Sequence, residues 1–381
     1  MIFYSMIKEP IKKQTSSESP KPIQTSKPKA SYLDRFQRIT AVDKILFTQH
    51  LGMMLRGGVS LSRALDILAT QTKKKHFKTA LLHIRAAVEK GDNLSDALEK
   101  YPNLFPAIFV SMIRAGESSG TLEETLSVLT QQTKKEHELV SKIKGALTYP
   151  VIVIFIMIFI GIGMIIFVIP RITDIFAETN AILPMPTRIL IGISETIIQN
   201  GLLFGVGAIA VIALFIFAIK KPKGKKILDT VLLSSPIIGG IIQKIQIARF
   251  ARNFSSLLIA NLPIVQALEL TGDTLNNSLY SNSIKQLTRD ISKGLLLSEI
   301  MKQFPKLYPT TIREIIHVGE ETGNIDSVLK ELAEFYEEEI SQIMENLPSI
   351  LEPALMVLIG VGVGGMAVAI IMPMYSLSQQ F

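Results

Sequence analysis

The chain contains few side chains of the kinds that usually carry out chemistry. It has no cysteine, and its five histidines are scattered at His50, His76, His83, His137 and His317. Thiolate nucleophiles, disulfides and cysteine metal sites are therefore excluded. Neither a phosphate-binding glycine loop nor a nucleophile elbow is present in the sequence. We therefore predict no catalytic residue, no metal site and no cofactor, in a protein that is not an enzyme.

Two glutamates stand out because the segment around each of them occurs twice. "MIRAGESSGTLEETL", residues 112–126, resembles "IIHVGEETGNIDSVL", residues 315–329, and Glu117 aligns with Glu320 at an offset of 203 residues. The same offset aligns residues 44–173 with 247–376 without insertion or deletion. The aligned pairs include Gly116 and Gly319, Gly120 and Gly323, Pro150 and Pro353, Gly161 and Gly364, and Pro170 and Pro373. The chain therefore contains a duplicated domain.

The repeated motif predicts a turn between two antiparallel helices. We expect the first helix to end at Ala115, with Gly116 in the left-handed conformation that often follows a helix. Gly120 then allows a tight return, and Thr121 caps the next helix with Glu124 as its capping-box partner. In the second copy, we expect the left-handed residue at Gly319, the tight return at Gly323 and the helix cap at Asn324.

In this interpretation Glu117 and Glu320 lie in the turn itself, where neither helix pattern requires a carboxylate. One interpretation is an acid placed near a helix N-terminus, where the helix dipole favours negative charge. The other is a contact with a partner protein, and both glutamates are therefore candidate interface residues.

Composition indicates a membrane protein with large water-facing parts. Apolar residues make up 48% of the chain and the mean hydropathy is +0.35, yet 19% of residues are charged. Each of three long uncharged runs exceeds the roughly 20 helical residues that cross a bilayer. We predict transmembrane helices at residues 149–170, 200–219 and 349–374.

Lysine and arginine are unevenly distributed around these runs. Lysines crowd the segment before the first span, and "KKPKGKK", residues 220–226, follows the second, whereas residues 171–199 contain only Arg171 and Arg188. Since positively charged flanks stay in the cytoplasm, both repeated domains and the N-terminus are predicted to be cytoplasmic. Residues 171–199 would form a short extracytoplasmic loop, and residues 375–381 an extracytoplasmic tail of a multi-pass inner-membrane protein.

The repeated soluble segments, residues 37–148 and 220–348, have helical periodicity and no β-type alternation, with a glycine turn at Gly57–Gly58 in the first. We therefore predict an all-α fold with two cytosolic bundles of about six helices each and three transmembrane helices. Residues 1–36 are rich in lysine, serine and proline, and we expect a disordered polar tail.

Two further features lie near the third predicted span. Glu352 directly precedes it, where the first copy has Tyr149. A charge there is expected either to reach the membrane surface or to contact a partner helix, and Glu352 is a third candidate interface residue. Gly364, aligned with Gly161, is four residues from Gly360, a spacing that lets membrane helices approach closely.

The motifs together resemble those of the F/PilC family of inner-membrane platform proteins of type II secretion systems and type IV pili. They are "RAGESSG" and "HVGEETG", "ALTYP" at 146–150, "LPMPTR" at 183–188, "IARFARNFSSLL" at 247–258 and "LEP" at 351–353. The resemblance covers residues 40–381. It implies a non-enzymatic scaffold, a homodimer or higher homo-oligomer, that engages a hexameric ATPase, (pseudo)pilins and other inner-membrane assembly proteins.

The sequence departs from the family pattern in two places. Many members begin with a folded N-terminal segment, in contrast to residues 1–36 here. Asn261 also stands where the first copy has Gly58, although asparagine tolerates the same left-handed turn. A small transporter or channel acting as an oligomer remains the alternative function, and the choice between pilus, secretion and competence systems remains open.

Overall fold

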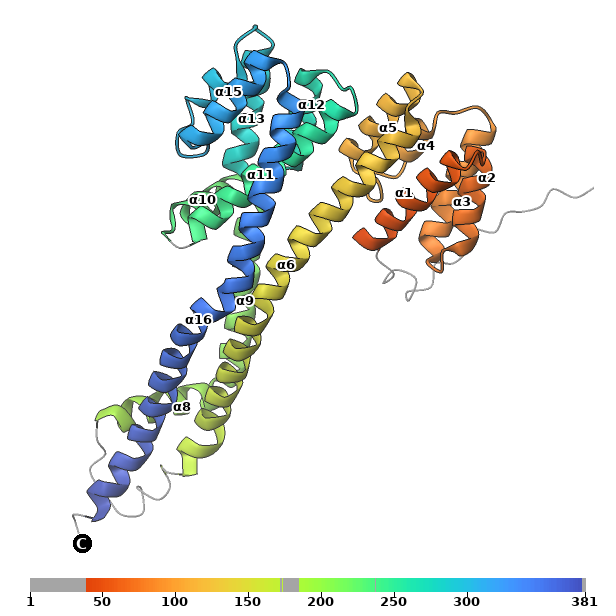
Figure 1. Ribbon diagram of the computed structural model, residues 1–381. Helices are drawn as coiled ribbons and strands as arrows, with labels where there is room; N and C mark the ends of the chain where they lie inside the picture. The colour runs from red at the N-terminus through yellow and green to blue at the C-terminus, as the bar shows by residue number, and fades with distance from the viewer. Residues whose placement is uncertain (1–38, 172, 174–184, 237, 379–381) are drawn as a thin grey trace, which may run out of the picture. The chain divides into compact units, whose positions relative to one another are not determined.

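The computed structural model describes residues 39–171, 173, 185–236 and 238–378, and these residues form helices without any β-strand (Figure 1). Six helices make up the first repeat. They are α1 (Ala41–Arg56), α2 (Leu61–Gln71), α3 (Lys75–Glu89), α4 (Leu94–Glu99), α5 (Ala107–Ser119) and α6 (Leu122–Gly163). We call α1–α5 with the start of α6 the first bundle.

The second repeat contains the six equivalent helices. They are α11 (Ile238–Ile259), α12 (Ile264–Thr274), α13 (Ser278–Ile291), α14 (Leu297–Met301), α15 (Thr310–Thr322) and α16 (Ile325–Ser378). The first and last residues of α12 lie 203 positions after those of α2, and the same holds for α15 and α5. We call α11–α15 with the start of α16 the second bundle, and the prediction of an all-α duplicated fold is confirmed.

The turn after the first helix of each repeat follows the expected pattern. Gly58 has φ 76° and Asn261 has φ 60°, so both adopt the left-handed conformation. Asparagine is one of the few side chains that tolerates this conformation, which explains why it can replace glycine there.

The cores of the two bundles differ by a set of matched substitutions. In the first bundle, Phe77 and Phe105 pack against Phe47 with ring centroids 6.0 and 5.4 Å away. The second bundle has tyrosines at the two equivalent positions, and burial raises the pKa of both hydroxyls. Each hydroxyl has a partner: Tyr280 donates to the Leu307 carbonyl at 2.8 Å, and Tyr308 pairs with Ser283 at 2.8 Å. Ser283 replaces the alanine of the first repeat, so these buried polar groups are satisfied.

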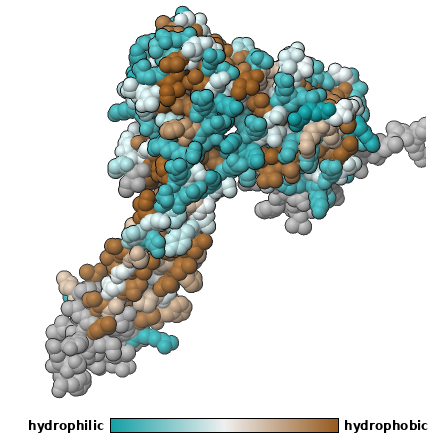
Figure 2. All heavy atoms as spheres, in the orientation of Figure 1, coloured by the Kyte–Doolittle hydropathy of each residue, from teal (hydrophilic) through white to brown (hydrophobic). Residues whose placement is uncertain are grey.

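The last helix of each repeat is long and changes character along its length. α6 has 42 residues and α16 has 54, which corresponds to about 80 Å for α16 at 1.5 Å per residue. Figure 2 shows hydrophilic residues over the bundles and mainly hydrophobic residues along the far parts of the long helices. Pro150 lies inside α6 and Pro353 inside α16, and both helices continue through them.

Two described helices are long and apolar enough to cross a membrane: the continuous helix from Leu122 to Arg171, and α16. Between them lie α8 (Met185–Gln199), α9 (Gly201–Lys220) and α10 (Pro222–Ser234). α9 coincides with the second predicted span, residues 200–219, and is apolar up to Lys220. Residues 185–199 of the predicted 171–199 loop form α8, and the other described residues of that segment, Arg171 and Thr173, are helical as well. The predicted tail, residues 1–36, lies outside the described residues.

A single turn of π-helix, η2 (Met164–Val168), follows α6 and ends two residues before Pro170. The Ile169 N–H donates to the Met164 carbonyl, five residues earlier. In the same pattern Pro170 would donate to the Ile165 carbonyl, but proline has no N–H. The buried Ser194 hydroxyl of α8 donates to that carbonyl instead, at 2.7 Å. The Ser194 hydroxyl thus supplies the hydrogen bond that Pro170 cannot donate.

Candidate functional site

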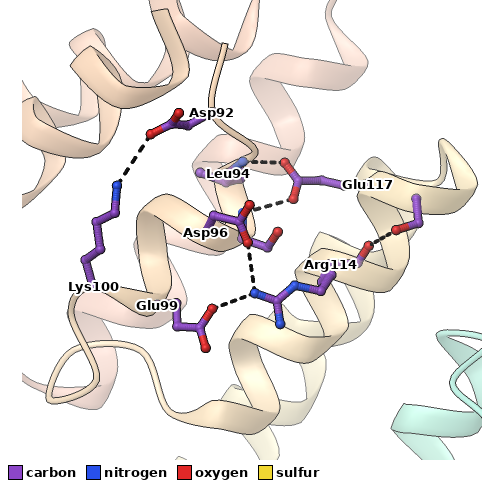
Figure 3. Close-up of polar contacts among 9 residues, drawn as sticks. Asp92, Leu94, Asp96, Glu99, Lys100, Arg114 and Glu117 are labelled. Atoms are coloured by element: carbon purple, nitrogen blue, oxygen red, sulfur yellow. Dashed lines mark hydrogen bonds and ion pairs between the residues drawn. The ribbon is translucent and has the colours of Figure 1, made fainter. Parts of the chain in front are cut away.

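The Glu117 carboxylate holds the N-terminus of the short helix α4 (Figure 3). Its Oε1 accepts a hydrogen bond from the Leu94 N–H at 2.5 Å, and its Oε2 accepts one from the Ser95 N–H at 2.9 Å. The Asn93 side chain stands at the capping position but makes no capping hydrogen bond. Glu117 therefore supplies from α5 the cap that α4 lacks locally, in the place where the helix dipole favours an anion.

The second bundle repeats this arrangement with one addition. Glu320 accepts hydrogen bonds from the backbone N–H groups of Leu297 and Ser298, the latter at 3.0 Å. It also accepts one from the Ser298 hydroxyl at 2.5 Å. Leu296 stands at the capping position of α14 and has no side-chain acceptor. We call each set of contacts the glutamate clamp; in both copies it joins residues 22 and 23 positions apart.

The turn between α5 and α6 differs from the prediction. α5 continues to Ser119, so Gly116 and Glu117 are inside the helix, and it is Gly120 that has the left-handed conformation, with φ 74°. In the second bundle Gly323 plays this part with φ 71°. Gly116 and Gly319 were wrongly expected there. The predicted cap at Thr121 is also wrong, because its side chain makes no capping hydrogen bond.

Gly116 is required for a different reason, which is the close approach of α6. A Cβ atom at Gly116 would lie 2.4 Å from Thr125 Oγ1 and 2.8 Å from Thr125 Cβ. At Gly319 a Cβ would lie 3.2 Å from Ile325 Cα and 3.2 Å from Val328 Cβ. These glycines therefore set how tightly the two helices of each hairpin pack. The glutamate that follows each glycine caps the short helix α4 in the first bundle and α14 in the second.

The charges around the clamp differ between the repeats. In the first, Arg114 donates to Asp96 at 3.0 Å and to Glu99 at 2.6 Å, and these hydrogen bonds raise the pKa of Arg114 (Figure 3). In the second, His317 occupies the place of Arg114 and lies 3.4 Å from Glu321. The two clamps are alike, but the surfaces beside them are not.

A second polar region joins the repeats to each other, and we call it the junction. Arg249 of α11 pairs with Glu136 of α6 at 2.7 Å, between the two repeats. Within the second repeat, Arg252 of α11 donates to both oxygens of Glu337 of α16 at 2.8 and 2.9 Å, and the Lys135 ammonium of the first repeat lies 3.8 Å from the same carboxylate. Burial raises the pKa of Glu136, as does the nearby charge of Glu337, whereas Arg249 opposes the shift. Beside these pairs lies a small apolar cluster of Leu139, Ala146, Ala248, Ile340 and Met344.

Sequence reasoning did not identify the junction, although a signal was present. Arg249 and Arg252 are the two arginines of "IARFARNFSSLL", a motif used only for its resemblance to a family. Two arginines three residues apart share one face of a helix, and where that face is buried they require acidic partners on neighbouring helices. The partners themselves, 113 and 85 residues away along the chain, could not be chosen from sequence.

The residues predicted near the membrane lie apart from the clamps and the junction. Glu352 is exposed on α16, and among the described residues it makes no hydrogen bond or ion pair. A Cβ at Gly360 or Gly364 would meet no atom of the chain within 4 Å, so neither glycine marks a close helix contact within the described part of one molecule. An apolar groove of about 520 Å³ separates α6 from α16 between Val153 and Met164 on one side and Ile359 and Ile371 on the other.

The fold and these sites define a class of protein: a membrane-associated pair of helical repeats in which each bundle is continued by its last helix into an apolar segment. The family model described as "Type II secretion system (T2SS), protein F" matches the chain twice, over residues 47–170 and 250–373. The two matches are offset by the same 203 residues as the repeat. The chain belongs to the type II secretion system protein F family.

Individual relatives cover most of the chain. The type IV pilus assembly protein PilC of Pseudomonas aeruginosa is 31% identical over 361 residues, 93% of this chain and 95% of that protein. The type IV pilus assembly protein TapC of Aeromonas hydrophila is 34% identical over 343 residues, 89% of this chain and 82% of that protein. The type II secretion system protein F of Pseudomonas aeruginosa is 27% identical over 341 residues, 90% and 84% of the two chains. These relatives are named as assembly or secretion-system proteins rather than as enzymes.

Proposed function

We propose that this chain is an inner-membrane platform protein that couples a cytosolic hexameric ATPase to the assembly of pilins or pseudopilins in a type IV pilus or type II secretion machine. Family membership supports the machine, because relatives of both kinds align over most of the chain. The observation that carries the coupling is the continuity of α6 and α16, each of which runs from a bundle into an apolar segment. A continuous helix transmits a displacement of its bundle to its membrane end.

The topology belongs to this proposal. Both bundles and the N-terminus face the cytoplasm, where the ATPase is, and α9 is the second of three spans. The cytosolic domains are then residues 37–148 and 220–348, and the three spans are residues 149–170, 200–219 and 349–374. Residues 171–199 form the extracytoplasmic loop, and residues 375–381 form a short extracytoplasmic end. The lysine-rich start of α10 fits a cytoplasmic flank.

The coupling is tested by interrupting one long helix while keeping both of its ends. Inserting a flexible Gly-Gly-Ser-Gly segment after Ser141 of α6 should leave the chain in the membrane and able to bind the ATPase, but fibre assembly or secretion should be lost. The matched control is the same insertion after Asn200, the exposed residue between α8 and α9. Normal assembly by the Ser141 insertion would refute transmission through α6.

We also propose that Glu117 and Glu320 contact the ATPase. Glu352 is proposed to contact a pilin helix. Each clamp glutamate is only half-buried, so a partner could still reach its carboxylate. The substitutions Glu117→Lys and Glu320→Lys separate the two roles when ATPase binding and bundle unfolding are measured together. Since lysine also breaks the clamp, Glu117→Ala and Glu320→Ala are the controls. A salt-sensitive loss of binding beyond that of the alanine variants supports a contact, whereas a loss of stability with unchanged binding restricts these residues to the clamp.

Glu352 is tested separately with Glu352→Gln, which keeps the shape of the side chain and removes its charge. Reduced fibre assembly at an unchanged protein level supports contact with a pilin helix. Wild-type assembly would mean that the carboxylate only reaches the membrane surface.

A further inference from the structure

The contact between the two repeats has a defined pair of faces. Arg249 and Asn253 of α11 bond to Glu136 and Gln132 of α6. By helical spacing, Ile245 and Ser256 share the α11 face with these residues, and Leu139 continues the α6 face. Gln132 donates to Asn253 at 2.9 Å, four residues from the Glu136–Arg249 ion pair on each helix. Arg249 keeps 13% of its side chain exposed and Ser256 keeps 5% of its surface exposed, so this face of α11 is largely buried.

The repeat supplies a second copy of each of these faces. An offset of 203 residues takes the α11 face to α1, where it comprises Val42, Leu46, His50 and Met53. Three of these residues are apolar and exposed: Val42 by 46%, Leu46 by 45% and Met53 by 48%. They follow one another at spacings of four and seven residues and form one stripe along the helix. We call it the α1 stripe.

The same offset takes the α6 face to α16. There Phe335 stands at the position of Gln132 and is 61% exposed, which is unusual for a phenylalanine outside the apolar segments. Glu339 follows it at the position of Glu136, and its carboxylate is paired with Lys244 of α11 in the same chain. Gln342, Asn346 and Ser349, further along the helix, are exposed and uncharged. In the part of the chain that the structure describes, the α1 stripe and Phe335 are therefore uncovered, and the charge of Glu339 is matched by Lys244.

We propose that the α1 stripe is the docking surface for α16 of a second copy of this chain, in the arrangement that α11 and α6 adopt within one molecule. Phe335 of one copy packs among Val42, Leu46 and Met53 of the next. Burying exposed apolar side chains of this size removes them from water and so drives association. The contact is head-to-tail, and a heterologous contact of this kind forms a closed ring when its rotation closes.

The chemistry of the two contacts differs in a way that keeps them apart. Within the chain, amide and charged groups face each other, as in Gln132 with Asn253 and Glu136 with Arg249. Between chains, Phe335 and Leu46 would take the places of Gln132 and Arg249. Glu339 takes the place of Glu136 and needs no arginine from the other chain, because Lys244 of its own chain pairs with it. Exchanging the partners would place Phe335 beside a buried arginine, or Gln132 on the apolar stripe. Such mismatches cost free energy, so each face selects its own partner.

The proposal is tested by cross-linking, for which the absence of native cysteine is an advantage. Two differently tagged full-length chains, one with His50→Cys and one with Phe335→Cys, are expressed together and treated in membranes with a short bifunctional thiol reagent. These positions are the repeat equivalents of Asn253 and Gln132. We expect a covalent product that carries both tags. As the positive control, Gln132→Cys with Asn253→Cys in one chain should give an internal link, detected by mass spectrometry of peptides.

Two comparisons make the result decisive. Lys78→Cys, on the exposed face of α3, replaces His50→Cys as the matched negative control and should give at least roughly tenfold less product. Products of His50→Cys with itself, in place of the mixed product, would mean a symmetric contact and would overturn the proposal. So would the absence of an intermolecular product when the internal control forms.

A second measurement identifies the occupant directly. A photoreactive amino acid placed at Leu46 in the full chain should be cross-linked to residues around Phe335 of another copy. The additional substitution Phe335→Glu should abolish this product without lowering the amount of protein in the membrane. Cross-links to residues 1–38 of the same chain, or to another protein, would assign the α1 stripe to that occupant and refute docking of a second copy. This inference requires membrane insertion of the chain but no contact with an ATPase.

Discussion

Removing the glutamate clamp should open α4 while the rest of the first bundle stays folded. α4 has only six residues, and its first two N–H groups, at the buried residues Leu94 and Ser95, have Glu117 as their acceptor. A hydrogen bond to a charged group contributes roughly 1.5–3 kcal/mol. Since Glu117 is half-exposed and water can replace part of the interaction, we expect Glu117→Ala to destabilise α4 by about 2–4 kcal/mol in total. Glu117→Gln keeps one acceptor and should cost about half of that.

Hydrogen exchange of the full-length protein in detergent measures this directly. A loss of 2–4 kcal/mol corresponds to exchange of the α4 amides that is roughly 30 to 1,000 times faster, at about 1.4 kcal/mol for each factor of ten. The control is Glu124→Ala, an exposed glutamate in the first turn of α6, which should change the stability of that helix end by less than about 1 kcal/mol. Exchange in α4 of Glu117→Ala within roughly threefold of wild type would refute the capping role.

Three further predictions concern packing, protonation and topology. Gly116→Ala should destabilise the first bundle by about 1–3 kcal/mol, because the added Cβ meets Thr125. Gly145→Ala, whose Cβ meets open space on α6, should instead stabilise that helix by about 0.5–1 kcal/mol. Thermal unfolding compares the stabilities of the two variants. Because burial raises the pKa of Glu136, the folded state favours the protonated form of this carboxyl. The wild type should therefore lose stability relative to Glu136→Gln as pH rises above the ordinary glutamate range. A difference in unfolding free energy between the two proteins that stays constant at all pH values would contradict this. For topology, an impermeant thiol reagent outside the cytoplasmic membrane should label Gln199→Cys, which is exposed at the end of α8, but not Ser234→Cys, and labelling at Ser234 would reverse the orientation.

The clamp shows where sequence reasoning succeeded and where it failed. The motif "RAGESSG" was correctly assigned to a return between two helices, and Glu117 was correctly considered as an acid near a helix N-terminus. The helix that it caps, however, is α4, which lies more than 20 residues earlier, and not the helix that follows the turn. The left-handed residue was placed at Gly116 instead of Gly120, because glycine is required both for a positive φ and for a close helix contact. Sequence does not distinguish these two requirements.

What the sequence alone determined is local or periodic. The 203-residue repeat, the helical character of both copies, the left-handed turn at Asn261 and the long apolar segments all follow from neighbouring residues or from a constant spacing. These features depend on backbone sterics and on burial of periodic apolar faces, which act within a few turns of chain. Tertiary structure decided which faces meet. The same helix face is buried on α11 and exposed on α1, because α11 meets α6 through this face whereas α1 packs on α6 through its opposite face, and the α11 contact depends on packing between segments more than 100 residues apart.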